Sequence, residues 1–378
     1  MKLGLGIGTK PARCKLILII LAVFVCAVFY LYPTAWAMQS STQSREQRSN
    51  GGPSNNPLLP VPTSVLEGLQ RSTAELWTRV TQSMKSGRVA QGTATLREIV
   101  TLDPTDSKAR MYLGMALAQT GDRKGAVEQY SKALEAAPAS AAIHYNLGAV
   151  LTELGSEEEA MGHFRTAIKS DSQLPKAHFQ LANLLMRKGQ YREAVSEYAA
   201  VIAIEPGNRF ARLMEAMALI RLKDYSEARS RLERGLSALP DDSDLALTLA
   251  RLLAACPDSS IRDGRRALEL VQQAMKNQKS FDLEQGQTLA MALAAVAQFD
   301  KAAQLQRFMI AELERAEQSQ LAQQLRANLE LYEHNQPCLT PWHDDDPIFV
   351  PVPGHLSDAT ELPGSAASRP DNTTGRKP

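Results

Sequence analysis

Residues 107–140 read SKARMYLGMALAQTGDRKGAVEQYSKALEAAPAS, and this stretch contains the features that recur along the chain. Leu113 and Gly114 stand at its positions 7 and 8, Gly121 at position 15 and Pro138 at position 32. Proline returns to position 32 in other 34-residue units, at Pro104, Pro206 and Pro240, while Ser172 fills the remaining place. A fixed period of this length indicates stacked supersecondary units rather than one enclosed core.

Each unit has the pattern of two helices joined by a turn. Positions 4, 7, 8 and 11 follow the helical spacing and form one apolar stripe, and positions 20, 24 and 27 form a second. A glycine or polar stretch at positions 15–18 separates the stripes, and small residues at positions 8, 20 and 27 allow the two helices to approach closely. Proline at position 32 cannot continue the second helix. The pattern therefore predicts an all-α fold built from helix pairs.

Seven such units and a capping helix account for most of the chain. We expect the units at 73–106, 107–140, 141–174, 175–208, 209–242, 243–282 and 283–316, and the cap at 317–335. The sixth unit is longer because its extra residues fall around Pro257–Arg262, in the turn between its helices, where insertions are tolerated best. Although 378 residues would suit two or three domains, the repeats predict one elongated solenoid with a tail at each end.

In its length and its order of small and large residues, the pattern resembles the tetratricopeptide repeat (TPR) family across about Thr73–Ala316. The resemblance implies a right-handed superhelical α-solenoid in which the first helix of each unit lines a concave face. In that family, positions 2, 5, 6, 9, 12 and 13 of each unit point into the groove. Carried onto this sequence, these positions give the expected partner-binding residues Lys108, Met111, Tyr112, Met115, Tyr145, Asn146, Lys176, Phe179, Asn183, Met186, Arg187, Phe210, Met214, Met217 and Arg221, to which the sixth unit adds Leu247 and Arg251.

Methionine and aromatic residues are frequent among these groove positions, interleaved with a few Arg, Lys and Asn residues. Methionine adapts to irregular apolar ligands and aromatic residues anchor interfaces, so we expect a groove for an extended or helical peptide with apolar anchors. The expected anchors on this chain are Met111, Tyr145, Phe179 and Met214. The alternative for each of them is packing between neighbouring repeats.

The predicted function is that of a non-catalytic scaffold or adaptor that binds other proteins and serves a cell-envelope assembly. An accessory subunit of a membrane-associated or periplasmic enzyme complex is the alternative, and self-association by stacking of repeats is also open. The sequence contains no CxxC, HExxH or GxSxG motif, so no enzyme activity, metal or cofactor is predicted. With 42 basic and 41 acidic residues and no basic block, nucleic-acid binding is not expected either.

Three further groups of residues have a structural as well as a chemical interpretation. His144 and His178 both stand at position 4, where a large packing residue is usual, so ring packing is favoured over a metal pair. The cluster His343-Asp344-Asp345-Asp346 lies between prolines in an expected loop and is interpreted as an exposed acidic turn rather than a metal site. Cys256 and Cys338 can form a disulfide outside the cytosol or remain as packed thiols.

The N-terminal residues have the composition of an export signal. Residues 1–15 contain four basic residues and no acidic ones, and Leu16–Tyr32 is a run of 17 uncharged, mainly apolar residues. Ala35-Trp36-Ala37 then provides a site of the kind that signal peptidase cuts. Residues 1–37 are therefore expected to be a cleaved signal peptide or an N-terminal membrane anchor through residues 16–32. Both place the repeats outside the cytosol, in the periplasm or on the inner membrane with the N-terminus in the cytosol.

Two other segments lack the repeat pattern. Residues 38–72 are rich in Ser, Gln, Asn and Pro, and we expect a flexible linker because they cannot bury enough apolar surface to fold alone. Residues 336–378 are rich in proline and are expected to be largely disordered. Within this tail, Trp342 and Ile348-Phe349-Val350 are the apolar residues that can dock onto the last helix.

Overall fold

The computed structural model describes residues 63–276, 281–344 and 346–351. Within these ranges the chain forms fifteen α-helices and one short 3₁₀ helix, and no β-strand occurs in them. All contacts described below lie within the compact unit formed by residues 67–378. The predicted leader at 1–37 lies outside the described residues, and in the described part of the chain no helix is long and apolar enough to cross a membrane.

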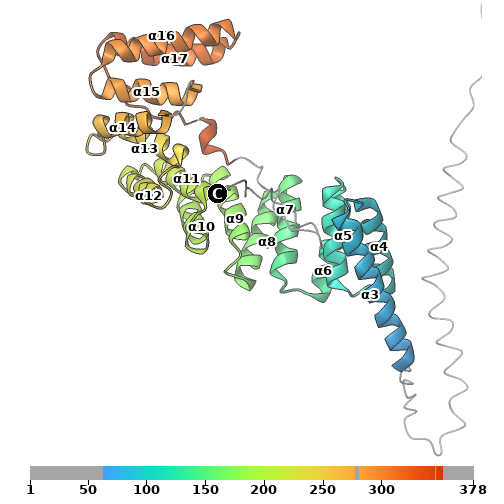
Figure 1. Cartoon of the computed structure of the whole chain (residues 1–378). Coiled ribbons are helices and arrows are strands. Elements are labelled where there is room, and N and C mark those ends of the chain that lie inside the picture. The colour runs from blue at the N-terminus through green and yellow to red at the C-terminus, as the bar shows by residue number, and fades with distance from the viewer. Residues whose placement is uncertain (1–62, 277–280, 345, 352–378) are drawn as a thin grey trace, which may run out of the picture. The chain divides into compact units, whose positions relative to one another are not determined.

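The helices form successive pairs followed by a final helix, as Figure 1 shows. The first helix of each pair is termed the A helix and the second the B helix. The A helices are α3 (Thr63–Lys85), α5 (Ser107–Gln119), α7 (Ala141–Glu153), α9 (Pro175–Arg187), α11 (Arg209–Arg221), α13 (Ser243–Ala255) and α15 (Leu283–Ala295). The B helices are α4 (Val89–Leu102), α6 (Arg123–Ala136), α8 (Glu157–Ser170), α10 (Tyr191–Ile204), α12 (Tyr225–Ala238), α14 (Gly264–Met275) and α16 (Phe299–Arg315). The final helix is α17 (Ser319–Glu333), and the 3₁₀ helix η1 spans Pro347–Phe349. The predicted all-α solenoid of helix pairs is thus confirmed.

The starts of the A helices are set by residues that recur with the period. Asp106, Asn208 and Asp242 stand at position 34 of their units, and each accepts a hydrogen bond from a backbone N–H in the first turn of the following helix. Before α9 the capping residue is replaced by Leu174, and Pro175 starts the helix instead. Proline is tolerated at that position because its missing N–H would have no partner within the helix.

Small residues allow the two helices of a pair to approach closely, as predicted. A Cβ atom on Gly114 would lie 2.7 Å from the ring of Tyr130, and one on Gly148 would lie 2.8 Å from the ring of Phe164. Both rings are buried. Position 8 must therefore remain small, because the aromatic ring at position 24 of the same unit fills the space above it.

The turn between the two helices of a pair requires a positive φ at position 15. Gly121 adopts this conformation with a φ of +89°, which glycine does readily because it has no Cβ. The fifth unit carries Lys223 at the same position, with a φ of +61°. A lysine in the left-handed region is strained, so this turn is less favourable than its counterparts.

Successive A helices lie closer together than successive B helices. Contacts join α5 to α7, α7 to α9, α11 to α13 and α13 to α15. Among the helices that the structure describes, no comparable contacts join one B helix to the next. The A helices therefore form the more closely spaced row.

The first helix starts before the predicted first unit, because α3 begins at Thr63. Leu69 continues, at helical spacing, the apolar stripe that includes the buried residues Leu76 and Val80. Residues 63–72 are therefore helical and do not belong to the predicted flexible linker.

The first part of the C-terminal tail packs against the helices, and residues 352–378 of the tail lie outside the described residues. Cys338 and Trp342 are only 4% and 7% exposed, and Trp342 meets Phe349 of η1 edge-on with ring centroids 6.3 Å apart. These residues bury enough apolar surface to hold the segment in place. They contact α11 and α13 rather than only the last helix. Cys256 and Cys338 are both free, buried thiols.

Candidate protein-binding groove

The candidate site is the surface presented by the A helices, which is termed the A face. Nine of the predicted groove residues are exposed or half-buried on it: Lys108, Met111, Tyr112, Lys176, Phe179, Arg187, Phe210, Met214 and Arg221. The remaining eight are buried: Met115, Tyr145, Asn146, Asn183, Met186, Met217, Leu247 and Arg251. Only the first group presents appreciable side-chain surface to a partner in this structure.

The buried group holds the helix pairs together. The Tyr145 ring packs against Phe164, with ring centroids 6.0 Å apart. The Tyr198 hydroxyl donates a hydrogen bond of 2.7 Å to the side-chain oxygen of Asn183, and burial raises the pKa of this tyrosine. Tyr145, an expected anchor, is only 4% exposed, so in this structure it serves packing, which is the alternative that the sequence leaves open.

An aromatic and cationic cluster lies at the N-terminal end of the A face. The Lys108 ammonium lies 4.9 Å from the centroid of the Trp77 ring, and that ring meets Tyr112 edge-on at 5.7 Å. These residues border an open depression that also includes Lys85. Trp77 is absent from the predicted groove residues, although it stands at position 5 of the first unit, as Met111 does in the second. Extending the period by one unit would have identified it.

The middle of the A face continues with partly exposed apolar side chains. Phe179 on α9 is half-buried and meets the buried Tyr198 ring edge-on, with centroids 5.8 Å apart. On α11, Phe210 is 41% exposed, and the Arg209 guanidinium lies 5.2 Å from its ring centroid. Met214 on the same helix is half-buried. Side chains of this kind can take up apolar groups of a partner without becoming rearranged.

Polar pairs join neighbouring repeats at the C-terminal ends of the A helices. Arg187 at the end of α9 pairs with Glu157 at the start of α8, at 2.9 Å. Arg221 at the end of α11 donates a hydrogen bond of 3.1 Å to the hydroxyl of Tyr191 at the start of α10. Both predicted groove residues therefore take part in the stacking of repeats as well as facing the groove.

The C-terminal end of the A face is covered by residues 338–351, which are termed the C-terminal segment. Figure 1 shows it in orange-red beside α11 and α13. Arg221 donates to the carbonyl oxygen of Asp344 at 2.8 Å and to its carboxylate at 3.0 Å. Arg251 donates to the Pro341 carbonyl at 2.5 Å, and its guanidinium lies 5.5 Å from the ring centroid of Trp342. The C-terminal segment therefore already occupies the surface around these two arginines of the A face.

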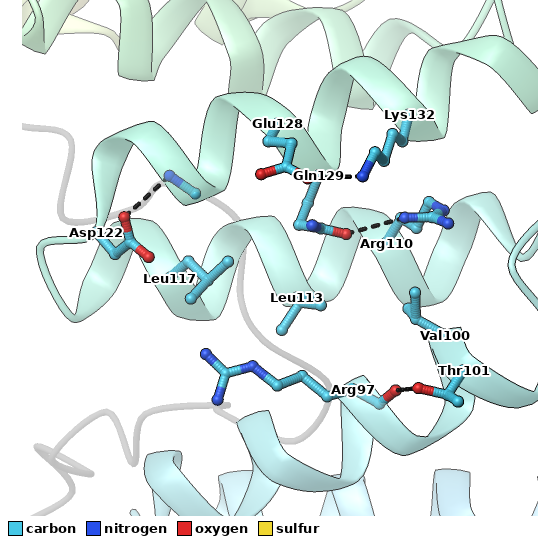
Figure 2. A pocket seen from close by; sticks show the side chains of 11 residues that line it. Arg97, Val100, Thr101, Arg110, Leu113, Leu117, Asp122, Glu128, Gln129 and Lys132 are labelled. Atoms are coloured by element: carbon cyan, nitrogen blue, oxygen red, sulfur yellow. Dashed lines mark hydrogen bonds and ion pairs between the residues drawn. The ribbon is translucent and has the colours of Figure 1, made fainter. Parts of the chain in front are cut away.

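A different depression lies between two B helices, α4 and α6 (Figure 2). Leu113 and Leu117 of α5 line it between the two B helices, and charged residues surround them. On α6, the Lys132 ammonium lies 2.6 Å from the carboxylate of Glu128, so these two charges neutralise each other. The wider spacing of the B helices accounts for this depression, and we do not assign a ligand to it.

Each of the two histidines at position 4 lies within hydrogen-bonding distance of a side chain on the second helix of its own pair. His144 Nδ1 lies 3.0 Å from His163 Nδ1, and its Nε2 lies 2.9 Å from the carbonyl oxygen of Pro138. His178 Nδ1 lies 2.6 Å from a carboxylate oxygen of Glu197. The rings therefore fasten their units, and the described residues contain no group of three or more potential metal ligands.

Comparison with known families identifies the repeat. Residues 151–217 and 185–256 match one family described as tetratricopeptide repeat, and residues 83–140 and 113–175 match a second family with the same description. The matched residues together include helices α4 to α13. A comparison with curated proteins found no match.

Several solved structures are similar to part of the chain. The crystal structure of MamA is 19% identical, with a TM-score of 0.42, and the alignment covers 45% of this chain and 92% of that chain. YrrB, described as a TPR protein with an unusual peptide-binding site, is 22% identical with a TM-score of 0.42, and covers 49% of this chain and 95% of its own. Pseudomonas aeruginosa PilF is 19% identical with a TM-score of 0.45, and the alignment covers 58% of this chain and 96% of that chain. These matches are partial and distant.

Proposed function

We propose, from the premise that this chain is a tetratricopeptide repeat protein, that it is a non-catalytic scaffold which captures a segment of another protein on the open part of its A face. The open part comprises the A helices up to α11 that the C-terminal segment does not cover. Its residues are Trp77, Lys108, Met111, Tyr112, Phe179 and Met214.

The succession of partly exposed apolar side chains along the A helices carries this proposal. Met111, Phe179 and Met214 stand on α5, α9 and α11, and each is only half-buried. Repeated helices present such residues at regular intervals along one surface. This arrangement suits an extended or helical polypeptide with several apolar anchors better than a compact small molecule.

The charges beside Trp77 favour an acidic partner. Lys85 and Lys108 line the depression there, and none of the described residues that line it is acidic. A carboxylate of the partner placed near Lys108 would be attracted to the ammonium, while an apolar side chain packs on Trp77 and Tyr112. We therefore infer that the partner segment carries acidic residues next to its apolar anchors.

Capture of a partner by the full-length chain tests the proposed surface. Replacing Met111, Phe179 and Met214 with serine should lower the amount of captured partner about tenfold or more, because buried anchors dominate such interfaces. The matched control replaces Leu102 and Phe308 with serine, since these residues are 51% and 52% exposed and lie on B helices. Undiminished capture by the first variant, or an equal loss in the control, would refute the assignment.

We further propose that the partner belongs to a cell-envelope assembly and that the repeats lie in the periplasm or on the inner membrane. The basic start, the apolar run and the Ala35-Trp36-Ala37 site of residues 1–37 support this location. Fractionation of cells that produce the tagged full-length chain provides the test. We expect the chain in the membrane or periplasmic fraction, and a purely cytosolic chain would end this part of the proposal.

A further inference from the structure

The C-terminal segment lies on the A face in the manner of a bound peptide. Arg221 and Arg251 contact it across 123 and 90 residues of sequence, so these contacts are not part of the repeat itself. Each arginine also faces an aromatic ring of the segment. The Arg251 guanidinium lies 5.5 Å from the ring centroid of Trp342, and that of Arg221 lies 5.0 Å from Phe349.

The contacts of the segment define a simple recognition chemistry. The backbone carbonyl oxygens of Pro341 and Asp344 accept hydrogen bonds from the two arginines. The aromatic ring of Trp342 and the carboxylate two residues later add side-chain specificity. Prolines stand at positions 337, 341, 347 and 351, and the chain turns after Trp342, where the Asp346 N–H donates a hydrogen bond to the His343 carbonyl oxygen. The surface therefore holds a turned, proline-flanked chain with an aromatic residue followed by an acid.

Arg251 makes this surface selective. It is only 7% exposed under the segment, where its charge is stabilised by the Pro341 carbonyl and the face of the Trp342 ring. An occupant with an aliphatic side chain in place of Trp342 would keep the carbonyl contact but bury the guanidinium without a ring beside it. The surface therefore favours an occupant that brings both a carbonyl acceptor and an aromatic ring.

The segment nevertheless fits the surface incompletely. The Tyr332 hydroxyl on α17 and the Trp342 indole N–H are buried, and neither has a hydrogen-bond partner among the residues that the structure describes. A partly open cavity of about 510 Å³ remains between the segment, α15 and α17. The Asp344 carboxylate that pairs with Arg221 is fully exposed to solvent, where an ion pair stabilises little. An occupant that fills these gaps would bind better than the segment does.

We propose that the surface under the C-terminal segment is a second partner-binding surface, and that the segment occupies it until a partner of the same chemistry displaces it. The partner is a protein segment in which an aromatic residue is followed two positions later by an acidic one, as in Trp342-His343-Asp344. Its ring packs on Arg251, and its carboxylate pairs with Arg221. This inference rests on the proposed function, because both assign protein binding to the A face.

A fluorescent peptide with the sequence of residues 337–351, carrying serine in place of Cys338, tests the proposal. We expect weak binding to the full-length wild-type chain, because its own segment occupies the surface. In the full-length variant with Trp342→Ala and Asp344→Ala the segment is released, and the peptide should bind at least about tenfold more tightly. Equal affinities, or no binding to a variant that keeps its helical circular dichroism spectrum, would overturn the proposal.

Two further sets of substitutions, each made in the variant whose segment is released, locate the peptide-binding site. Arg251→Ala should remove the gain in peptide affinity, because it removes the contacts to the carbonyl and the ring. Phe179→Ser together with Met214→Ser should leave the gain in place, since both residues belong to the open part of the A face. The reverse pattern would refute the assignment to Arg251 without touching the proposed function, which the capture experiment with the open-part anchors tests separately.

The reactivity of Cys338 provides a readout in the wild-type chain. This thiol is only 4% exposed in the docked segment. Its alkylation should therefore be slow, and mass spectrometry of the alkylated chain after digestion measures the rate. An excess of the competitor peptide should displace the segment and raise the alkylation rate several-fold. A rate that already equals that of a free thiol, or that does not respond to the peptide, would show that the segment is not a displaceable occupant.

Discussion

The open and covered parts of the A face differ in where their aromatic rings come from, the repeat helices or the C-terminal segment. In the open part the helices supply them, with Trp77 and Phe179 as examples. In the covered part the helices supply the guanidinium groups of Arg221 and Arg251, and the C-terminal segment supplies the rings. One helix-pair architecture thus carries two chemically different surfaces, because the backbone pattern fixes only where side chains stand and not which groups they bear.

A substitution within the helix pairs of the open part should have the largest effect. Gly148→Val places side-chain atoms where the Phe164 ring lies, since even a Cβ would be 2.8 Å from it. The free energy of unfolding should fall by about 3 kcal/mol, as measured by urea denaturation. Because repeats are stabilised mainly by their neighbours, the covered part should remain docked in this variant, as slow alkylation of Cys338 would show.

The control for this prediction is Gly162→Ala on α8, where nothing lies within 4 Å of the added Cβ. This change should be neutral or stabilising by up to about 1 kcal/mol, because alanine favours the helix more than glycine does. A destabilisation by Gly148→Val no larger than that of ordinary surface substitutions would be incompatible with the close approach of α7 and α8.

In the covered part, Arg251→Ala should release the C-terminal segment more completely than Arg221→Ala. Arg251 is buried and bonds to both a carbonyl and a ring, so its loss should weaken docking by about 1–3 kcal/mol. Arg221 also bonds to a carbonyl and faces a ring, but it is only half-buried and the carboxylate that it pairs with is fully exposed, so less protection depends on it. Hydrogen exchange of residues 338–344 measures the difference, and equal loss of protection in the two variants would contradict it.

Acid should weaken the open part through His163 on α8. Burial, and to a lesser degree the neighbouring His144, lower the pKa of His163 from its usual value of 6.5, while Glu159 acts in the opposite direction. The unfolded chain therefore binds a proton more readily than the folded chain, and stability is lost as the pH falls below about 6.5. Thermal melts above and below this pH should show a smaller acid-induced loss for His163→Gln than for the wild type. An unchanged loss would mean that this histidine does not contribute.

The smallest effect is expected at the turn between α11 and α12, where the open and covered parts meet. Lys223 has a φ of +61°, so Lys223→Gly should relieve backbone strain and raise the stability by about 0.5 kcal/mol. Glu135→Gly on the exposed side of α6 is the control and should lower the stability by about 1 kcal/mol. If both glycine substitutions destabilise equally, the strain assigned to Lys223 is absent.

The helix pairs could be predicted from the sequence because their determinants lie within one unit and recur. Gly114 beneath Tyr130 and the cap at Asp106 are such local features. Exposure along the A helices could not be predicted in the same way. Met111 and Tyr145 share position 5, yet the first is half-buried and the second buried, because exposure depends on how the side chains of adjacent helices pack around that position.

The repeat pattern could not predict the covered part of the site, for a different reason. The contact between Arg251 and Pro341 joins residues 90 positions apart, and the C-terminal segment has no counterpart in other units. Its aromatic residues indicate that it can dock, but the sequence does not specify where. The arginines that receive it are recognisable only once α11, α13 and the segment are placed together.

Site-specific photo-crosslinking in cells tests most directly whether the A face holds another polypeptide. A photoreactive residue is placed at Phe179 or Met214 on the A face, and at Leu102 or Phe308 on B helices as the comparison. We predict crosslinked partner adducts from the two A-face positions and none above background from the two B-helix positions. Adducts of equal yield from both sets, or from the B helices alone, would contradict partner binding on the A face.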